Sequence, residues 1–223
     1  WQTDFLNLQL TLTVKPMFKY ISSLQRLRQM VSLMDNTVGR LAIPRGTRRE
    51  PVSIPRADFE AEWVFPDNSD PERVVLYLPG GAYVIRMPNA HTGMVSRLCR
   101  NANAKALMAY YRLAPEHPFP ACLEDAVLAY RWLLRQGVAP DSIIIAGDSA
   151  GGGLTLSTLL ALKERKLPMP ACAWAWRATT PPSAGSAAAR SPPTRARPAT
   201  SRRRNWSCSA RKWASPRASI STR

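Results

Sequence analysis

The sequence has few histidines and cysteines, and their spacing argues against metal and disulfide frameworks. Its 223 residues include 2 histidines and 4 cysteines. The cysteines are far apart, form no C-x-x-C pair and lie in no histidine cluster: Cys99, Cys122, Cys172 and Cys208. Structural zinc sites and small disulfide-rich domains need such groups at close spacing. We therefore expect no metal site, and reduced thiols as in a cytoplasmic protein.

Long apolar runs and a basic leader are also missing. No run of 18 apolar residues occurs, so we expect no segment that spans a membrane. The first residues mix polar and apolar side chains without a positively charged start, so we expect no signal peptide and a cytoplasmic location. The length suits one domain, or two small ones, with a sizeable core. The sequence does not indicate an oligomeric state.

Acidic residues are absent from the last part of the chain, where positive charge gathers. The net charge is +16, yet residues 1–174 hold 20 bases against 15 acids, whereas the rest holds 11 bases and no acid. Residues 175–219 also lack Val, Leu, Ile, Met, Phe and Tyr. Such a composition cannot bury enough apolar surface to offset the entropy of ordering. We expect residues 175–223 to form a disordered basic tail.

Two origins of this tail remain open. Ala, Arg, Pro, Ser and Gly are what GC-rich codons give out of frame, and apolar periodicity stops abruptly, so we favour a frameshift near residue 174. The alternative is a true basic arm for nucleic acid or a membrane surface, with charge and an aromatic ring in Arg202-Arg203-Arg204 and Trp206. A nucleic-acid partner is the weaker reading, because the body of the chain is only mildly basic.

The apolar pattern before the tail predicts strands that alternate with helices. An amphipathic helix is expected over residues 16–41, packed on the core or placed as a lid over a pocket. Two short strands or a hairpin follow in 51–65. Further strands are expected at 73–78, 106–110, 142–146 and 170–174, and helices at 91–103, 121–136 and 150–165. The alternation predicts an α/β fold whose parallel sheet is covered on both faces.

The stretch that carries chemistry is Gly147-Asp148-Ser149-Ala150-Gly151, between a β-branched apolar run and a helical pattern. G-x-S-x-G in this context is typical of a nucleophile elbow, in which the serine sits on a strained turn above the sheet. Glycines let neighbouring backbone pass closely. The alternative is an ordinary turn with serine as the helix cap. We predict Ser149 as a catalytic nucleophile.

A second glycine pair ends the strand expected at 73–78. A serine that attacks an ester creates an oxyanion, which backbone N–H groups stabilise. Gly80 and Gly81 could offer two such groups, and Ala150 a third at a helix N-terminus. A Gly-Gly pair alone is more often a plain turn. The pair becomes a specific signal of an oxyanion site because a serine elbow ends another strand.

With both motifs in place, the chain resembles the hormone-sensitive-lipase-like bacterial esterases of the α/β-hydrolase fold. Three segments within about residues 50–174 carry the resemblance, namely LYLPGGAY at 76–83, YRLAPEHPFPA at 111–121 and GDSAGG at 147–152. It implies hydrolysis of short- to medium-chain carboxylic esters through an acyl-serine at Ser149. It also implies oxyanion donors at Gly80, Gly81 and Ala150, a small-molecule substrate and no cofactor.

The resemblance also implies a domain plan. Residues 1–50 would be an N-terminal helical cap region, residues 51–174 a partial α/β-hydrolase core, and residues 175–223 the tail. The C-terminal third of the fold would be absent. Within the matched region, Pro79 replaces the family's loop histidine and Ala82 its third glycine, so the anchoring of this loop is in question.

The partners of a catalytic serine are missing. Serine needs a base, usually a histidine steered by a carboxylate, and the family order is Ser, acid, His. After Ser149 the chain has one acid, Glu164, expected on a solvated helix face, and no histidine. His117 is expected to be structural, and His91 lacks an evident orienting partner. We expect little or no turnover. The alternative function is a catalytically dead remnant or a non-catalytic binding protein.

Overall fold

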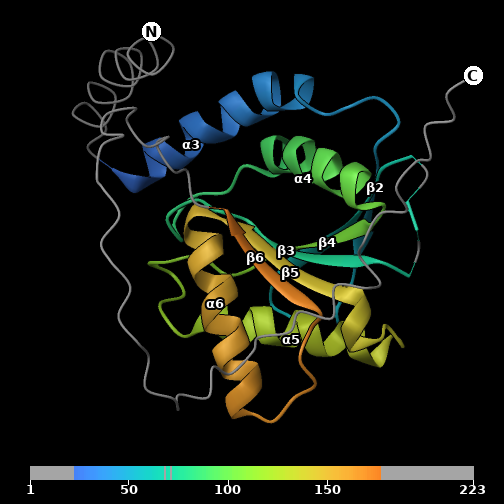
Figure 1. The fold of residues 1–223 in the computed structure, drawn as a ribbon. Helices are drawn as coiled ribbons and strands as arrows, with labels where there is room; N and C mark the ends of the chain where they lie inside the picture. The colour runs from blue at the N-terminus through green and yellow to red at the C-terminus, as the bar shows by residue number, and fades with distance from the viewer. Residues whose placement is uncertain (1–22, 68, 71, 177–223) are drawn as a thin grey trace, which may run out of the picture.

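The computed structural model describes residues 23–67, 69–70 and 72–176 (Figure 1). The expectations for residues 1–22 and for the tail beyond residue 176 lie outside this range. The helices are α3 (Leu24–Met34), α4 (Pro88–Ala102), α5 (Ala121–Arg135) and α6 (Ser149–Glu164). A π-helical turn (Asp35–Gly39) follows α3, and a 3-10 turn (Pro140–Ser142) precedes β5. The strands are β1 (Arg48–Val52), β2 (Glu60–Phe65), β3 (Val74–Leu78), β4 (Lys105–Tyr110), β5 (Ile143–Asp148) and β6 (Cys172–Trp176).

The strands form one mixed sheet in the order β1-β2-β4-β3-β5-β6. β4, β3, β5 and β6 are parallel, while β1 and β2 pair antiparallel at one side. All five residues of β3 are buried, as expected for a central parallel strand without a solvated face. The α/β fold with a mostly parallel sheet is confirmed.

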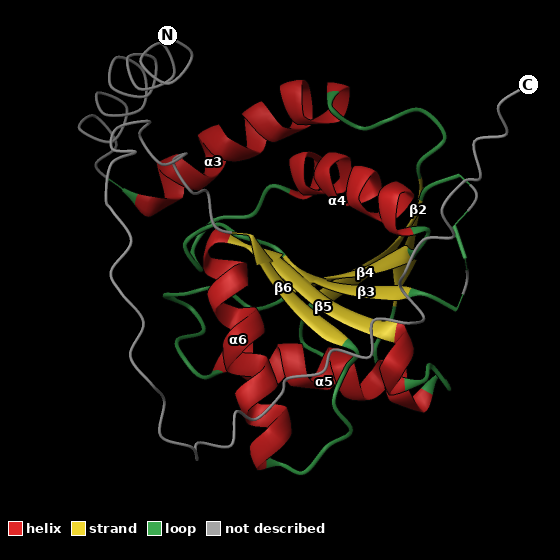
Figure 2. Cartoon of the chain, in the orientation of Figure 1, coloured by secondary structure: helices red, strands yellow, loops and turns green. Residues whose placement is uncertain are grey.

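Helices cover both faces of the sheet, with α4 on one face and α5 and α6 on the other (Figure 2). Alternate residues of β3 feed the two cores: Leu76 and Leu78 pack toward α5 and α6, whereas Val75 and Tyr77 pack toward α4. The predicted elements are present with ends displaced by a few residues. The helix α4 starts at Pro88, earlier than predicted, because a proline at the first helical position forfeits no hydrogen bond.

The first described helix, α3, does not pack into the core. None of its residues is buried, and Leu33 and Met34 are 67% and 54% exposed. The expectation of a core-packing helix is therefore wrong for the described part of residues 16–41. The apolar residues Leu24, Leu27, Met30 and Val31 of this helix are half-buried. The helix instead lies above α4 (Figure 1).

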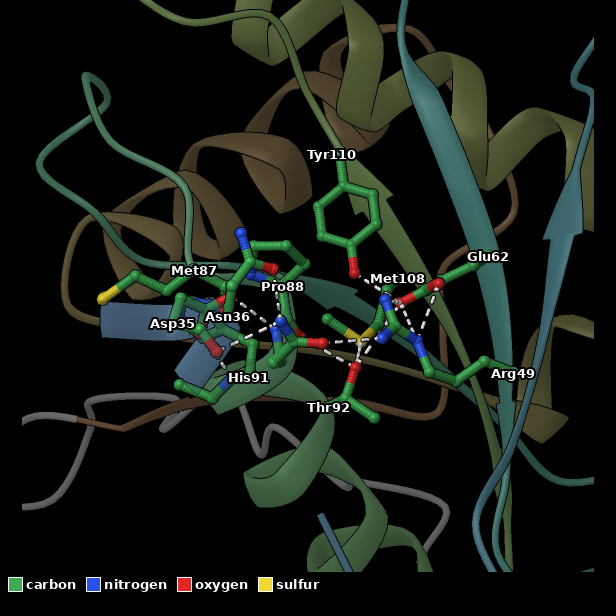
Figure 3. A network of polar contacts seen from close by, with 12 residues as sticks. Asp35, Asn36, Arg49, Glu62, Met87, Pro88, His91, Thr92, Met108 and Tyr110 are labelled. Atoms are coloured by element: carbon green, nitrogen blue, oxygen red, sulfur yellow. Dashed lines mark hydrogen bonds and ion pairs between the residues drawn. The ribbon is translucent and has the colours of Figure 1, made fainter. Parts of the chain in front are cut away.

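A polar network joins the end of α3 to α4 and to the antiparallel strands (Figure 3). The buried carboxylate of Asp35 accepts hydrogen bonds from the backbone N–H groups of Asn89 and Ala90, at 2.9 and 2.8 Å. These groups belong to the first turn of α4, which has no intrahelical acceptors for them. Arg49 extends the network by donating to the Asn89 side chain and to Glu62, both at 2.9 Å. The start of α4 is thereby fixed.

Candidate active site

The carboxyl ends of β3 and β5 lie side by side and carry the two sequence motifs. Leu78 is in register with Gly147, so the loop that begins at Pro79 runs beside the turn at Ser149. The chain leaves β3 for β4 on one side and leaves β5 for β6 on the other. A reversal of this kind opens a crevice at the carboxyl edge of a parallel sheet, where ligands bind. The topology thus brings both motifs to such a crevice.

Ser149 occupies a strained turn. Its φ is +48°, a left-handed conformation that is uncommon for a residue with a Cβ, and it is the first residue of α6. Its side chain is exposed, and its hydroxyl forms no hydrogen bond with another residue in the described part of the chain. Strain of this kind concentrates at functional sites.

Two glycines make this turn possible. A Cβ on Gly147 would lie 2.7 Å from the carbonyl oxygen of Leu78, and a Cβ on Gly151 would lie 2.9 Å from the carbonyl carbon of Pro79. Real Cβ atoms do not approach backbone atoms so closely. The close passage of α6 past the end of β3 therefore requires glycine at both positions.

Asp148, next to the serine, is the centre of a group of hydrogen bonds. Its Oδ1 accepts from the Tyr77 hydroxyl and from the Gly80 N–H, both at 2.8 Å, and lies 3.4 Å from His91 Nε2. Burial by itself would raise the pKa of Asp148. The hydrogen bond and charge of His91, with the donors of Tyr77 and Gly80, outweigh burial and lower the pKa to about 2. Asp148 is therefore a fixed anion that links β3, α4 and the glycine loop.

The glycine loop is anchored although it carries Pro79 in place of a histidine. The Tyr111 hydroxyl donates to the Pro79 carbonyl at 2.5 Å, and the Tyr83 hydroxyl donates to the Ala150 carbonyl at 2.8 Å. Within the loop, the N–H groups of Val84 and Ile85 donate to the Gly81 carbonyl, both at 2.9 Å. The loop is thus tied both to the residue after β4 and to the start of α6.

One expected oxyanion donor is occupied. The Gly80 N–H donates to Asp148, which contradicts the expectation that it is free for a substrate oxygen. The amides of Gly81 and Ala82 have no hydrogen bond with any residue that the structure describes. Ala150 lies in the first turn of α6, where backbone N–H groups lack intrahelical acceptors. Three backbone donors other than Gly80 therefore remain near the turn.

A family model described as alpha/beta hydrolase fold matches residues 75–221. The chain belongs to this family. Among curated proteins it is 44% identical to an acetyl-hydrolase of Streptomyces hygroscopicus, over 60% of this chain and 43% of that protein. It is 38% identical to a putative acetyl-hydrolase, LipR, of Mycobacterium tuberculosis, over 65% of this chain and 48% of that protein.

Two solved structures resemble this chain in fold. EstE5, in a crystal soaked with p-nitrophenyl butyrate, superposes with a TM-score of 0.63 at 42% identity, over 69% of this chain and 50% of that chain. An esterase from the bacterial hormone-sensitive lipase family gives a TM-score of 0.62 at 37% identity, over 69% and 52%. The resemblance to this esterase group is confirmed. The chain spans about half the length of these relatives.

Neither histidine of this α/β-hydrolase chain forms a hydrogen bond with Ser149. His91 is buried on α4, and its two ring nitrogens face other acceptors, Met87 O at 2.7 Å and Asp148 at 3.4 Å. Asp148 is therefore the partner that the sequence did not reveal. His117 is exposed, and its ring has no hydrogen bond within the described residues, so no hydrogen bond of the ring supports the expected structural role. Glu164 lies exposed at the end of α6, as expected.

Two hollows flank the loop and the turn. The larger has a volume of about 500 Å³ and lies between α3, residues 84–88 and the segment after β4. The smaller, about 290 Å³, is lined by apolar groups that include Tyr83, Phe119 and Leu154. Since Tyr83 bonds the carbonyl of Ala150, the smaller hollow adjoins the residue that follows Ser149.

Among the residues that the structure describes, no group of three or more His, Cys, Asp or Glu side chains could hold a metal ion. No helix among them is long and apolar enough to cross a membrane. Cys99 and Cys122 are both buried free thiols.

Proposed function

We propose that the chain carries the nucleophile half of a carboxylic ester hydrolase. The observation that carries this proposal is Ser149, exposed at φ +48° at the end of β5, beside the glycine loop that ends β3. The serine oxygen attacks the ester carbonyl, an acyl-serine forms, and the alcohol leaves with the hydroxyl proton. Water then cleaves the acyl-serine and releases the carboxylic acid.

The oxyanion of this reaction would be held by backbone donors. We retain Gly81 and Ala150 and add Ala82, whose amide is unengaged among the described residues. Gly80 becomes a positioning residue, because its N–H holds Asp148. Each donor aimed at an oxyanion typically lowers the barrier by about 3 kcal/mol.

The proposed substrates are short- to medium-chain esters. An acetyl-hydrolase is among the relatives, and the EstE5 crystal was soaked with a butyrate ester. The apolar hollow at Tyr83 and Leu154, about 290 Å³, would accommodate a short apolar group next to the turn. The sequence-based alternative, a binding protein with a basic tail, has no supporting observation in the described residues.

We further propose that this chain alone turns over slowly. A base must reach the serine hydroxyl, and His91 is engaged with Asp148 and Met87. Without a base, Ser149 is a weak nucleophile at neutral pH. An acylated serine should therefore form slowly with p-nitrophenyl butyrate and persist.

The test is intact and peptide mass spectrometry after incubation with p-nitrophenyl butyrate, together with steady-state release of p-nitrophenol. We expect a butyryl group on Ser149, none in Ser149→Ala, and unchanged labelling in Ser53→Ala. Ser53 is the matched control because it is an exposed serine that lines neither hollow. A butyryl group on another residue would refute the proposal that Ser149 is the nucleophile. Turnover at the rate of an ordinary esterase would refute the proposal that the chain lacks a base.

A further inference from the structure

One of the cations that line the 500 Å³ hollow, Arg86, forms no ion pair with a carboxylate of the described residues. Three guanidinium groups line it, those of Arg28, Arg86 and Arg112. Arg28 forms a two-pronged pair with Glu116, with bonds of 2.6 and 2.9 Å. Arg112 forms a similar pair with the buried carboxylate of Asp125, whose shortest bond is 2.7 Å. These two positive charges are therefore balanced within the protein.

Arg86 is bound differently. Its Nη2 donates to the carbonyls of Tyr110 and Tyr111, at 2.9 and 3.0 Å, and the guanidinium lies 5.5 Å from the centre of the Tyr110 ring. The donors on its Nε and Nη1 have no partner among the described residues. Burial lowers the pKa of Arg86, and the charge of the exposed Glu60 acts on it without forming an ion pair. The group remains a cation, since arginine does not lose its proton in proteins.

The backbone fixes this guanidinium in place. Both carbonyl acceptors belong to the end of β4 and the residue after it, and the tyrosine ring supports one face. A guanidinium that is already fixed in place loses little further conformational freedom when it binds an anion, and its planar fork matches a carboxylate. The unused donors lie on a group that lines the hollow.

We propose that this hollow binds a small monocarboxylate, with Arg86 as its anion-recognising residue. Asp58 also lies at the wall, 3.7 Å from Arg112, so Arg86 is the guanidinium of this hollow that has no carboxylate at ion-pair distance within the described residues. A carboxylate carries one charge on two oxygens that match this fork, whereas a phosphate dianion would meet stronger repulsion from Glu116 and Asp58. Val84, Pro88 and Leu113 supply apolar wall for a short alkyl chain. The volume lies in the range of small-molecule sites. The inference does not depend on ester hydrolysis.

The probe is hexanoate, compared with hexanamide at equal ionic strength by isothermal titration calorimetry of the full chain. The two ligands have the same shape and differ in charge. We expect saturable binding of one hexanoate, with hexanamide about tenfold weaker or more, because charge-assisted hydrogen bonds are about twice as strong as neutral ones. Equal binding of both ligands, or no saturable hexanoate binding, would overturn the proposal.

Three variants locate the site. Arg86→Met should weaken hexanoate about tenfold or more and leave hexanamide unchanged, since the apolar stem is retained. Arg40→Met, at an exposed position outside the hollow, should bind both ligands as the parent does. Ser32→Trp places a large ring at the wall without touching Arg86 and should weaken both ligands. Far-UV circular dichroism checks each fold. If Arg86→Met does not fold, Ser32→Trp decides, and unchanged hexanoate binding in either folded variant overturns the site.

Discussion

The Oδ1 atom of Asp148 lies 2.8 Å from the backbone nitrogen of Gly80, so the residue before the serine holds the loop after β3. His91 and Tyr77 reach the same oxygen atom from α4 and β3. The crevice of the candidate site is therefore held together by the anion of Asp148. This arrangement makes the stability of the site dependent on pH.

The first prediction concerns the stability of the protein at acid pH. The folded pKa of Asp148 is about 2, below its ordinary value of 3.8, so its contribution to stability is fully present above about pH 4 and is lost as pH falls toward 2. The difference corresponds to about 2 kcal/mol. Asp148→Asn should lower the free energy of unfolding by about that amount at pH 7, and the gap should close toward pH 2. Urea unfolding across this range measures it. Glu164→Gln, at an exposed position, is the control, and a gap that does not vary with pH would contradict the prediction.

The second prediction tests the close passage of α6 by the end of β3. Gly151→Ala should cost about 3 kcal/mol, because its Cβ would collide with the backbone of Leu78 and Pro79. Gly153→Ala in the same helix is the matched control. Its Cβ would meet only the Tyr83 hydroxyl, at 3.3 Å, and alanine favours a helix by up to about 1 kcal/mol. Urea unfolding of both variants gives the comparison. Equal effects at the two positions would show that the passage is not tight.

The third prediction contrasts two neighbouring acids on α5. Asp125 is 2% exposed and pairs with Arg112, whereas Glu124 pairs with Arg165 at the surface. Asp125→Ala should cost about 3 kcal/mol, since it leaves the half-buried guanidinium of Arg112 without its hydrogen-bonded partner and with only the exposed Asp58, 3.7 Å away. Glu124→Ala should cost less than about 1 kcal/mol, because water screens an exposed pair. Thermal and urea unfolding of the two variants test this. A larger loss at Glu124 than at Asp125 would contradict it.

Local patterns in the sequence were enough to predict the sheet, the helices and the serine turn. The apolar run 143–146 followed by Gly147 and Ser149 predicts strand, turn and helix without help from distant residues. The family resemblance added the function class. These features depend on short-range spacing, which is why they could be recognised in a single sequence.

What could not be predicted depends on distant partners. The burial of α3 was overestimated, because periodicity marks an apolar face but not how deeply it is buried. The role of Asp148 rests on Tyr77, Gly80 and His91, which are far from it in sequence. The aspartate was visible within the G-D-S-A-G motif, yet only the fold brings its donors together. The same holds for Arg86, whose carbonyl acceptors come from the end of β4.

The last prediction concerns the outer face of α6. Leu156 and Leu160 are 55% and 62% exposed on one side of this helix, and β6 is the last strand in the order of the described sheet. Exposed apolar groups beside the end of a sheet favour association between copies. The double variant Leu156→Gln with Leu160→Gln should therefore associate less, while its free energy of unfolding changes by less than about 0.5 kcal/mol.

Light scattering after size exclusion, over a range of protein concentrations, measures the association. Leu162→Gln is the contrasting variant, because Leu162 is fully buried on the same helix. It should lose about 3 kcal/mol or more, through a lost apolar side chain and a buried amide without partners. If the double variant and the parent chain associate equally at every concentration, the leucine face is not the surface through which copies meet.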